Sequence, residues 1–148
     1  MAVDARKVAL IGCGFVGSAS AFALMQSGLF SEMVLIDANT AKAEGEALDI
    51  AHGLSYAKPM QIYSGTYEDI ADAAIIVISA GANQKPGETR LDLVNKNVGI
   101  FKSIIPEIKK QGFDGRWHRV AELTALVLMM KACRDIDDGT INSVSKFT

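Results

Sequence analysis

Three glycines near the N-terminus have the spacing of a nucleotide-binding turn. Gly12, Gly14 and Gly17 form the pattern G-x-G-x-x-G between a short apolar run and a segment of helical character. In such a turn the first glycine permits a tight bend and the second lets the backbone approach a diphosphate. The third glycine lets the helix pack closely on the sheet. The N-terminus of that helix would offer free N–H groups and partial positive charge to the diphosphate.

An acidic residue completes this pattern. Asp37 ends a second apolar run, twenty residues after Gly17. A carboxylate there can accept hydrogen bonds from the adenosine ribose of NAD, and it repels the 2′-phosphate of NADP. The alternative is an ordinary strand–turn–helix with small helical residues and a solvated acid. Because strand, turn, helix and acid occur in the expected order, we favour a NAD site.

A polar loop in the middle of the chain offers a second group of reactive side chains. Residues 80–89 follow the most apolar run and contain two glycines, Gly81 and Gly87. This loop includes the polar residues Gln84, Lys85 and Glu88, and Arg90 follows it directly. A glycine-hinged loop of this kind suits a lid over a small substrate, and an arginine can bind a carboxylate or polarise a carbonyl. The alternative is a solvated surface loop with ordinary charges, and spacing alone does not decide between them.

The apolar pattern supplies the elements that would position these residues. We expect strands at 7–11, 33–36, 61–64 and 73–79, and helices at 15–27, 40–52 and 91–111. Thr40 is expected to cap the start of a helix, and Gly28 and Gly112 to end helices. The run 73–79 is continuous rather than alternating, which is typical of a strand covered on both faces. The order predicts an α/β fold, a Rossmann-type doubly wound parallel sheet with helices on both faces.

Composition limits the alternatives. The chain has 148 residues, of which 49% are hydrophobic and 22% charged, as expected for one globular domain. A net charge of −2 gives no reason to expect a nucleic-acid partner. The apolar runs are far shorter than the roughly 20 residues of a membrane-spanning helix, and the N-terminus does not have the pattern of a signal peptide. Two cysteines make no disulfide framework, so we expect a cytoplasmic protein in which Cys13 is a small filler.

Four segments are similar to one known family. KVALIGCGFVG at 7–17, LIDAN at 35–39, ALDIAHG at 47–53 and AGANQKPGETRLDLVNKN at 80–97 resemble the bacterial L-lactate dehydrogenases of the lactate/malate dehydrogenase family. The resemblance runs from about residue 6 to residue 115, and the last segment is the most specific. It implies NAD as the cofactor and lactate or pyruvate, a small 2-hydroxy or 2-oxo acid, as the substrate. It also implies a homo-oligomer, because relatives are tetramers.

The resemblance further implies roles for single residues. The positions that it places at the cofactor are Gly12, Gly14, Val16, Gly17, Asp37, Lys42, Tyr67, Gly81, Ala82 and Ser103. Lys42 and Tyr67 would border the adenosine end. Arg90 would be the catalytic residue of a mobile loop, binding the substrate and polarising its carbonyl. Gln84 would determine specificity, since the related malate dehydrogenases have an arginine there. A neutral Gln84 favours lactate over malate, because an unpaired carboxylate in a closed site is costly.

The sequence departs from the family after residue 115. Arg116-Trp117-His118-Arg119 stands where relatives continue with an apolar strand, so we expect the sheet to be incomplete at that point. We therefore expect a NAD-binding domain at 1–115 and an unmatched segment at 116–148. A helix at 120–134 is favoured, although 126–130 could be a strand, and a polar tail follows. The aspartates of this tail do not have the spacing of a calcium loop, and we expect no metal site.

The family's catalytic histidine has no counterpart that the motifs identify here. In relatives a second domain supplies that histidine, an aspartate that orients it and an arginine that binds the substrate carboxylate. Neither His52 nor His118 matches the histidine motif. We therefore expect the parent activity to be hydride transfer between lactate and NAD, and this chain alone to be nearly inactive. A non-catalytic NAD-binding fragment and a fusion or truncation product are the alternatives.

Overall fold

The computed structural model describes residues 4–113 and 116–119. The strands are β1 (Asp4–Ile11), β2 (Glu32–Ile36), β3 (Gln61–Ser64), β4 (Ala73–Ile78) and β5 (Arg116–Arg119). The helices are α1 (Phe15–Ser27), α2 (Thr40–His52) and α3 (Arg90–Lys110), with 3-10 turns at Gly53–Tyr56 and Tyr67–Ile70. The described residues divide into two compact units, one with residues 4–80, 108–113 and 116–119, and one with residues 81–107.

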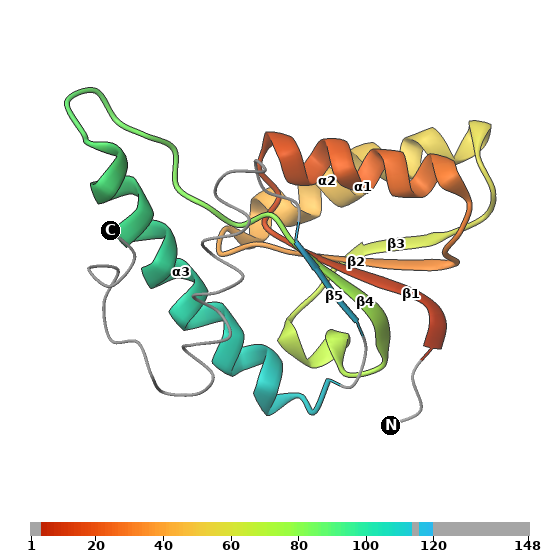
Figure 1. The fold of residues 1–148 in the computed structure, drawn as a ribbon. Helices are drawn as coiled ribbons and strands as arrows, with labels where there is room; N and C mark the ends of the chain where they lie inside the picture. The colour runs from red at the N-terminus through yellow and green to blue at the C-terminus, as the bar shows by residue number, and fades with distance from the viewer. Residues whose placement is uncertain (1–3, 114–115, 120–148) are drawn as a thin grey trace. The chain divides into compact units, whose positions relative to one another are not determined.

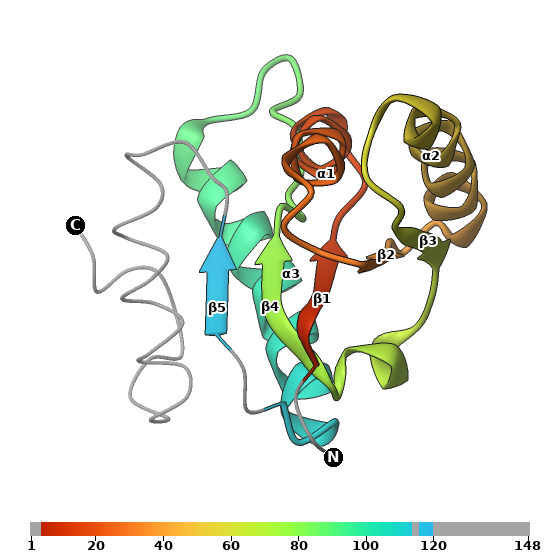
Figure 2. The same ribbon diagram turned by 90° about the vertical axis from the view of Figure 1, so that its right-hand side faces the viewer.

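The first unit contains a five-stranded parallel sheet. Its strand order is β3-β2-β1-β4-β5, as Figure 2 shows. In the centre of the sheet, Leu10 of β1 pairs with Leu35 of β2 on one side and with Val77 of β4 on the other. The order of the strands reverses between β1 and β4, and ligands of such sheets bind at the carboxyl ends next to this point. The fold is the predicted Rossmann type.

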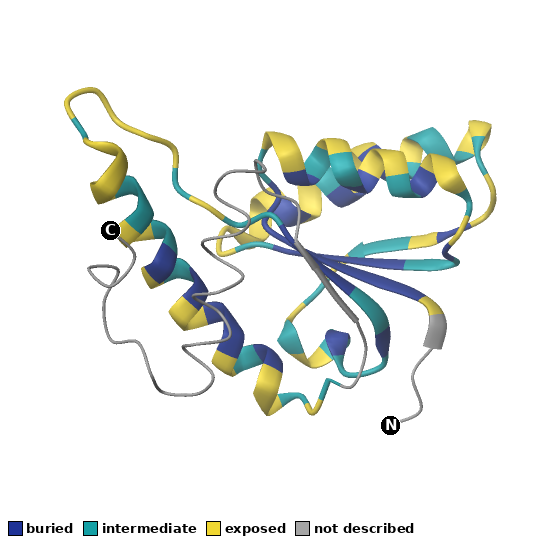
Figure 3. Ribbon diagram, viewed as in Figure 1, coloured by how far each residue is buried: buried dark blue, intermediate teal, exposed yellow. Residues whose placement is uncertain are grey.

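Two helices cover one side of this sheet. α1 connects β1 to β2 and α2 connects β2 to β3, and Figure 1 shows both helices on the same side. Their buried residues are Gly17, Ala21 and Met25 in α1 and Ala43, Ala47 and Ile50 in α2. All of these except Gly17 belong to one core with Val8, Leu10, Met33 and Leu35 of the strands. Figure 3 shows the buried centre of the sheet in dark blue. Each large apolar side chain buried there contributes about 1.5–3 kcal/mol.

The helix ends follow the sequence signals with one exception. Gly28 ends α1 with φ +60, and its N–H donates to Met25 O. Gly112, with φ +64, lies just after α3 and donates to Lys109 O. The cap of α2, however, is Asn39 and not the predicted Thr40. Asn39 is extended, and its side chain accepts the N–H of Lys42 at 3.2 Å. Asparagine and threonine are both favourable N-cap residues, so the sequence pattern alone does not distinguish Asn39 from Thr40 as the cap.

The sheet does not stop at β4, and the prediction that it lacks the following strand is wrong. β5 pairs in parallel with β4, from Ile75 opposite Arg116 to Ile78 opposite Arg119. Strand pairing uses backbone N–H and C=O groups, which these residues supply whatever their side chains. The order of β1 to β5 is that of the first five strands of the dinucleotide-binding fold. The helix and tail predicted for 120–148 lie outside the described residues. Within the described part of the chain, no helix has the length and apolarity to cross a membrane.

One lysine is buried among the strands. Lys7 of β1 is 5% exposed, and its Nζ lies 3.0 Å from Oε1 of Glu32 and 2.8 Å from Oδ1 of Asp72. The hydroxyl of Tyr63 donates to the same Glu32 oxygen at 2.7 Å. Burial lowers the pKa of Lys7, but the hydrogen bonds with Asp72 and Glu32 outweigh it and raise the pKa above its usual value. This cluster joins segments of β1, β2, β3 and the residue that precedes β4.

Candidate functional site

The first glycine of the turn is required by the backbone around it. Gly12 has φ +101, in a region that L side chains rarely adopt. A Cβ on Gly12 would also lie 2.7 Å from Cα of Ala80 and 2.8 Å from the carbonyl carbon of Ser79. The N–H of Gly12 donates to Ile36 O at 2.7 Å, and Ser79 Oγ donates to Gly12 O at 3.2 Å. Hydrogen bonds from two neighbouring strands thus hold the start of the turn.

The other two glycines differ in what surrounds them. A Cβ on Gly17 would overlap the carbonyl oxygen of Gly12 and lie 2.8 Å from Ser79 Oγ, so α1 packs against the strand ends as predicted for a third glycine. Gly14 is extended, with φ −77 and ψ −177, and a Cβ there would meet no atom within 4 Å. The protein's own packing therefore does not require a glycine at position 14. The open space beside Gly14 would let a diphosphate come close to the backbone of the turn.

The N-terminus of α1 has the character of an anion site. The first backbone hydrogen bond of the helix runs from Ser18 N–H to Gly14 O at 2.8 Å, so earlier N–H groups have no partner within the helix. Gly14 makes no side-chain capping bond, and this fully described helix has no acidic residue in its first turn. The side chains of Phe15 and Val16 are 94% and 55% exposed. Donors and dipole therefore face a region that a diphosphate can enter.

The carboxylate of Asp37 connects the turn to the next loop. Oδ2 accepts the N–H of Cys13 at 2.7 Å, and Oδ1 accepts the N–H of Asn39 at 2.9 Å. A carboxylate has about four lone-pair positions, so acceptor capacity remains for ribose hydroxyls. Asp37 is partly exposed at the end of β2, as the predicted role requires.

Cys13 lies in the turn but has the environment of a packing residue. Its side chain is 1% exposed and belongs to the core. Burial, together with the negative charges of Asp37 and Glu46, raises the pKa of the Cys13 thiol to about 11. A thiol that stays protonated is a poor nucleophile. Cys13 is therefore suited to the filler role expected from the sequence.

Lys42 and Tyr67 follow the ends of neighbouring strands. Lys42 lies in the first turn of α2, after β2, and its side chain is exposed. Tyr67 begins the 3-10 turn after β3 and is partly buried. The carboxyl ends of parallel strands share one edge of the sheet, so both segments begin at the edge that holds Asp37. Their contact with a nucleotide stays a prediction.

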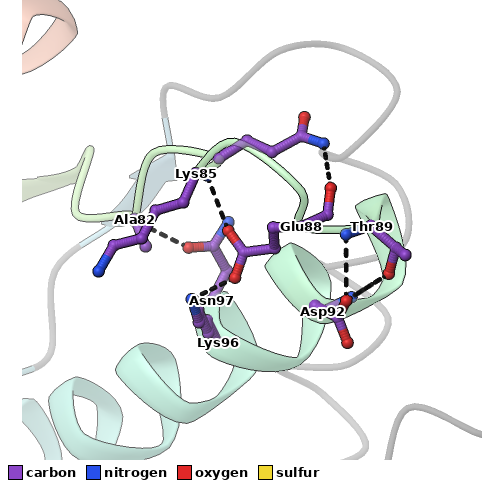
Figure 4. Close-up of polar contacts among 8 residues, drawn as sticks. Ala82, Lys85, Glu88, Thr89, Asp92, Lys96 and Asn97 are labelled. Atoms are coloured by element: carbon purple, nitrogen blue, oxygen red, sulfur yellow. Dashed lines mark hydrogen bonds and ion pairs between the residues drawn. The ribbon is translucent and has the colours of Figure 1, made fainter.

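The second unit carries the polar loop, and Glu88 holds that loop together (Figure 4). The carboxylate of Glu88 accepts the N–H of Lys85 at 2.9 Å and forms an ion pair with Lys96, and its side chain is only 9% exposed. The backbone oxygen of Glu88 accepts Nε2 of Gln84 at 2.8 Å. The hydrogen bond with Lys96 and that with the Lys85 N–H keep the pKa of Glu88 below its usual value. The predicted specificity residue is thus bound within its own loop.

Two further bonds fix the ends of this loop. The N–H of Ala82 donates to Oδ1 of Asn97 at 2.8 Å, and a Cβ on Gly81 would lie 3.5 Å from the same oxygen. Thr89 and Asp92 form a reciprocal cap at the start of α3, with Thr89 Oγ1 donating to Oδ2 of Asp92 at 2.6 Å. Sequence reasoning missed the roles of Asn97, Asp92 and Glu88. Only the T-x-x-D spacing is a recognisable signal, similar to a capping box.

Arg90 and Ser103 lie on α3. Arg90 is the first residue of the helix and is exposed, and its side chain makes no hydrogen bond or ion pair with the residues that the structure describes. Its guanidinium is therefore available to an anion or a carbonyl. Ser103 is exposed, and its Oγ donates to Ile100 O of the same helix at 2.7 Å. The ligand contacts assigned to Gln84, Arg90 and Ser103 stay predictions.

Comparison with known sequences identifies the family. The model of the lactate/malate dehydrogenase NAD-binding domain matches residues 6–122 and thus continues through β5. L-lactate dehydrogenase of Priestia megaterium is 51% identical over 149 residues, which cover 96% of this chain and 47% of that protein. L-lactate dehydrogenase of Geobacillus sp. (strain WCH70) is 59% identical over 111 residues, which cover 74% of this chain and 35% of that protein.

Solved structures agree with the sequence matches. The minor L-lactate dehydrogenase from Enterococcus mundtii, in its ligand-bound form, superimposes with a TM-score of 0.79 at 41% identity, covering 88% of this chain and 42% of that one. The malate dehydrogenase from Picrophilus torridus, in its apo form, gives a TM-score of 0.74 at 30% identity, covering 87% of this chain and 42% of that one. The chain thus spans less than half the length of these relatives. It belongs to the lactate/malate dehydrogenase family and corresponds to the NAD-binding domain of that family.

Proposed function

We propose that this chain binds NAD and supplies the cofactor-binding half of an L-lactate dehydrogenase. The observation that carries the proposal is the contrast between the glycines. Packing requires Gly12 and Gly17, whereas Gly14 faces open space beside the free N–H groups of α1. That arrangement suits a diphosphate, and Asp37 stands at the end of the adjacent strand for the ribose.

Each part of the dinucleotide has a proposed partner. The N–H groups of the first turn of α1, including that of Val16, bind the diphosphate. Asp37 accepts the ribose hydroxyls and disfavours NADP through charge repulsion. Lys42 and Tyr67 border the adenosine. The remaining cofactor contacts are Gly81, Ala82 and Ser103. When bound, NAD accepts a hydride from the substrate or returns it.

The substrate is proposed to be lactate or pyruvate. Arg90 is exposed and has no partner among the described residues, so its guanidinium can stabilise negative charge on the substrate oxygen. Gln84 is neutral, and its amide is held by the backbone of Glu88. A substrate with a methyl group needs no counter-charge at that position, whereas the second carboxylate of malate does. Lactate is therefore favoured over malate.

We further propose that the 148-residue chain alone turns over lactate negligibly. Neither of its two histidines, His52 and His118, matches the catalytic histidine of the family. General base catalysis at the hydroxyl typically contributes 10²–10⁴-fold, and we expect that contribution to be absent. The resemblance also favours a cytoplasmic homo-oligomer. The competing function is a NAD-binding fragment with no part in catalysis.

Titration calorimetry of the purified chain tests the binding proposal. NADH should bind, and the affinity for NADPH should be lower by about tenfold or more. Asp37→Ala should lower the affinity for NADH. No heat of binding at millimolar NADH would sink the proposal. Pyruvate-dependent loss of NADH absorbance tests the proposal that this chain alone is nearly inactive, and robust turnover would contradict that proposal.

A further inference from the structure

The carboxylate of Asp37 accepts two backbone hydrogen bonds of the protein itself, from Cys13 and Asn39. We propose that Asp37 positions the glycine turn for the diphosphate through the N–H of Cys13, and so couples ribose recognition to diphosphate binding. The inference rests on the proposed NAD site and adds a second role to a residue otherwise assigned to the ribose alone.

The geometry of the turn carries the first step. Cys13 stands between Gly12 and Gly14, and its N–H donates to Oδ2 of Asp37 at 2.7 Å. Hydrogen bonds to a charged acceptor are about twice as strong as neutral ones. Gly14, the next residue, makes no side-chain capping bond, and its backbone leads directly into α1. The bond to Asp37 therefore acts one residue before Gly14, the N-cap after which the free N–H groups of α1 begin.

The rest of the carboxylate is fixed as well. Oδ1 accepts the N–H of Asn39 at 2.9 Å, so the loop after β2 holds the carboxylate in place. The side chain of Cys13 is 1% exposed in the core, which restrains the turn on its other side. Without the carboxylate, the N–H of Cys13 loses its acceptor and the turn must shift to find another one. The donors that would face the diphosphate then move with it.

Two explanations of Asp37 predict opposite results for one ligand. The probe is a NADH analogue that lacks both hydroxyls on the adenosine ribose. If Asp37 serves the ribose alone, Asp37→Ala should leave binding of this analogue unchanged, or tighten it because a negative charge near the diphosphate is removed. If Asp37 positions the turn, the variant should bind the analogue about tenfold more weakly, the effect of losing one charge-assisted hydrogen bond.

The experiment measures Kd by calorimetry for NADH and for the analogue, with wild type, Asp37→Ala and Asp37→Asn. The asparagine variant keeps the size of the side chain but has one oxygen for two N–H donors, so it should show the same direction of loss. Asp49→Ala is the matched control. Asp49 is exposed on α2, so this substitution also removes one carboxylate but leaves both hydrogen bonds of Asp37 in place, and analogue binding should not change.

Amide exchange of the ligand-free protein provides the second readout. The Cys13 N–H should exchange faster in both Asp37 variants and at the wild-type rate in Asp49→Ala. Unchanged Cys13 exchange, or analogue affinity equal in wild type and Asp37→Ala, would overturn the inference while NADH binding by wild type upholds the NAD site. Failure of wild type to bind NADH would instead defeat the proposed function. Melting curves of each variant establish that the comparison is between folded proteins.

Discussion

The Nζ atom of Lys7 lies 2.8 Å from Oδ1 of Asp72, and this ion pair links β1 to the residue that precedes β4. The Lys7 side chain is 6% exposed, whereas the Asp72 side chain is 35% exposed. Glu32 is the second carboxylate on the same ammonium. The charge of Lys7 is therefore buried but doubly compensated, and each carboxylate retains some contact with solvent.

We expect Lys7→Met to destabilise the fold by about 2 kcal/mol, because the partly exposed carboxylates of Glu32 and Asp72 lose their charged hydrogen-bond donor. Urea unfolding of the variant and the wild type measures the difference. Lys58→Met is the control, since Lys58 is exposed and substitution there should change stability by less than about 0.5 kcal/mol. Equal effects of the two substitutions would show that the Lys7 cluster does not stabilise the fold.

Stability should fall in alkaline solution through the same cluster. Burial, and then the hydrogen bond to Glu32, raise the pKa of Tyr63 to about 12, and the pKa of Lys7 is raised as well. In the unfolded chain these groups lose their protons near pH 10, while the folded protein still holds them. The unfolded state is then favoured as the pH rises from about 10 toward 12. Thermal midpoints measured against pH should decline over this range, and less steeply in Tyr63→Phe.

Two alanine substitutions should separate packing from binding in the glycine turn. Gly17→Ala places a Cβ against the carbonyl oxygen of Gly12, so we expect a loss of about 2 kcal/mol in stability. The Cβ of Gly14→Ala would meet no protein atom within 4 Å, so this variant should keep the stability of the wild type. Its affinity for NADH should fall about tenfold, because the Cβ enters the space proposed for the diphosphate. Urea unfolding and calorimetry give the two readouts. Unaltered NADH affinity in Gly14→Ala would place the diphosphate elsewhere.

The Cys13 thiol should react slowly with alkylating reagents at pH 8. Its pKa of about 11 leaves very little thiolate, and its side chain is buried. A Cys133→Ser background isolates Cys13, and mass spectrometry follows the modification over time. Alkylation should become fast in denaturant. Rapid labelling of the native protein would mean that the turn opens readily.

The loop in the second unit should loosen in acid. The hydrogen bonds with Lys96 and with the Lys85 N–H lower the pKa of Glu88. The ionised carboxylate therefore holds the loop fully at pH values above the ordinary carboxyl pKa. The loop is released as the pH falls through the lowered pKa of Glu88. NMR titration of the Glu88 carboxyl carbon and the Lys85 amide follows this change. Lys96→Met should shift both titrations toward higher pH. Titrations unaffected by Lys96→Met would exclude the ion pair as the cause.

The site was predictable where the backbone itself demands a residue type. Gly12 and Gly17 are glycines because the turn has no room for a Cβ, and that demand leaves a fingerprint in the sequence. Asp37 was selected as a candidate by its distance from that fingerprint, and its contact with a ribose stays a prediction. The strands and helices before residue 80 followed from apolar periodicity, because burial selects residue types along each element.

Other features depend on partners far away in the chain, and the sequence carries no local sign of them. β5 pairs through its backbone, so Trp117 and His118 gave no indication of a strand. Lys7 meets Asp72 only where β1 lies beside the start of β4, 65 residues further along the chain. Glu88 lies in a segment with the composition of a solvated loop, and its role depends on Lys96, in the second turn of α3. Tertiary contacts of this kind override local propensity.

The exposed side chains at the start of α1 have a consequence for how this site can evolve. Phe15 and Val16 point away from the core, while the N–H groups beside them are the proposed donors to the diphosphate. Every residue type except proline carries that N–H. Substitutions at these two positions can therefore alter the surroundings of a bound nucleotide without altering the donors. The path of the backbone therefore preserves the proposed hydrogen-bond donors, while the side chains beside them can vary.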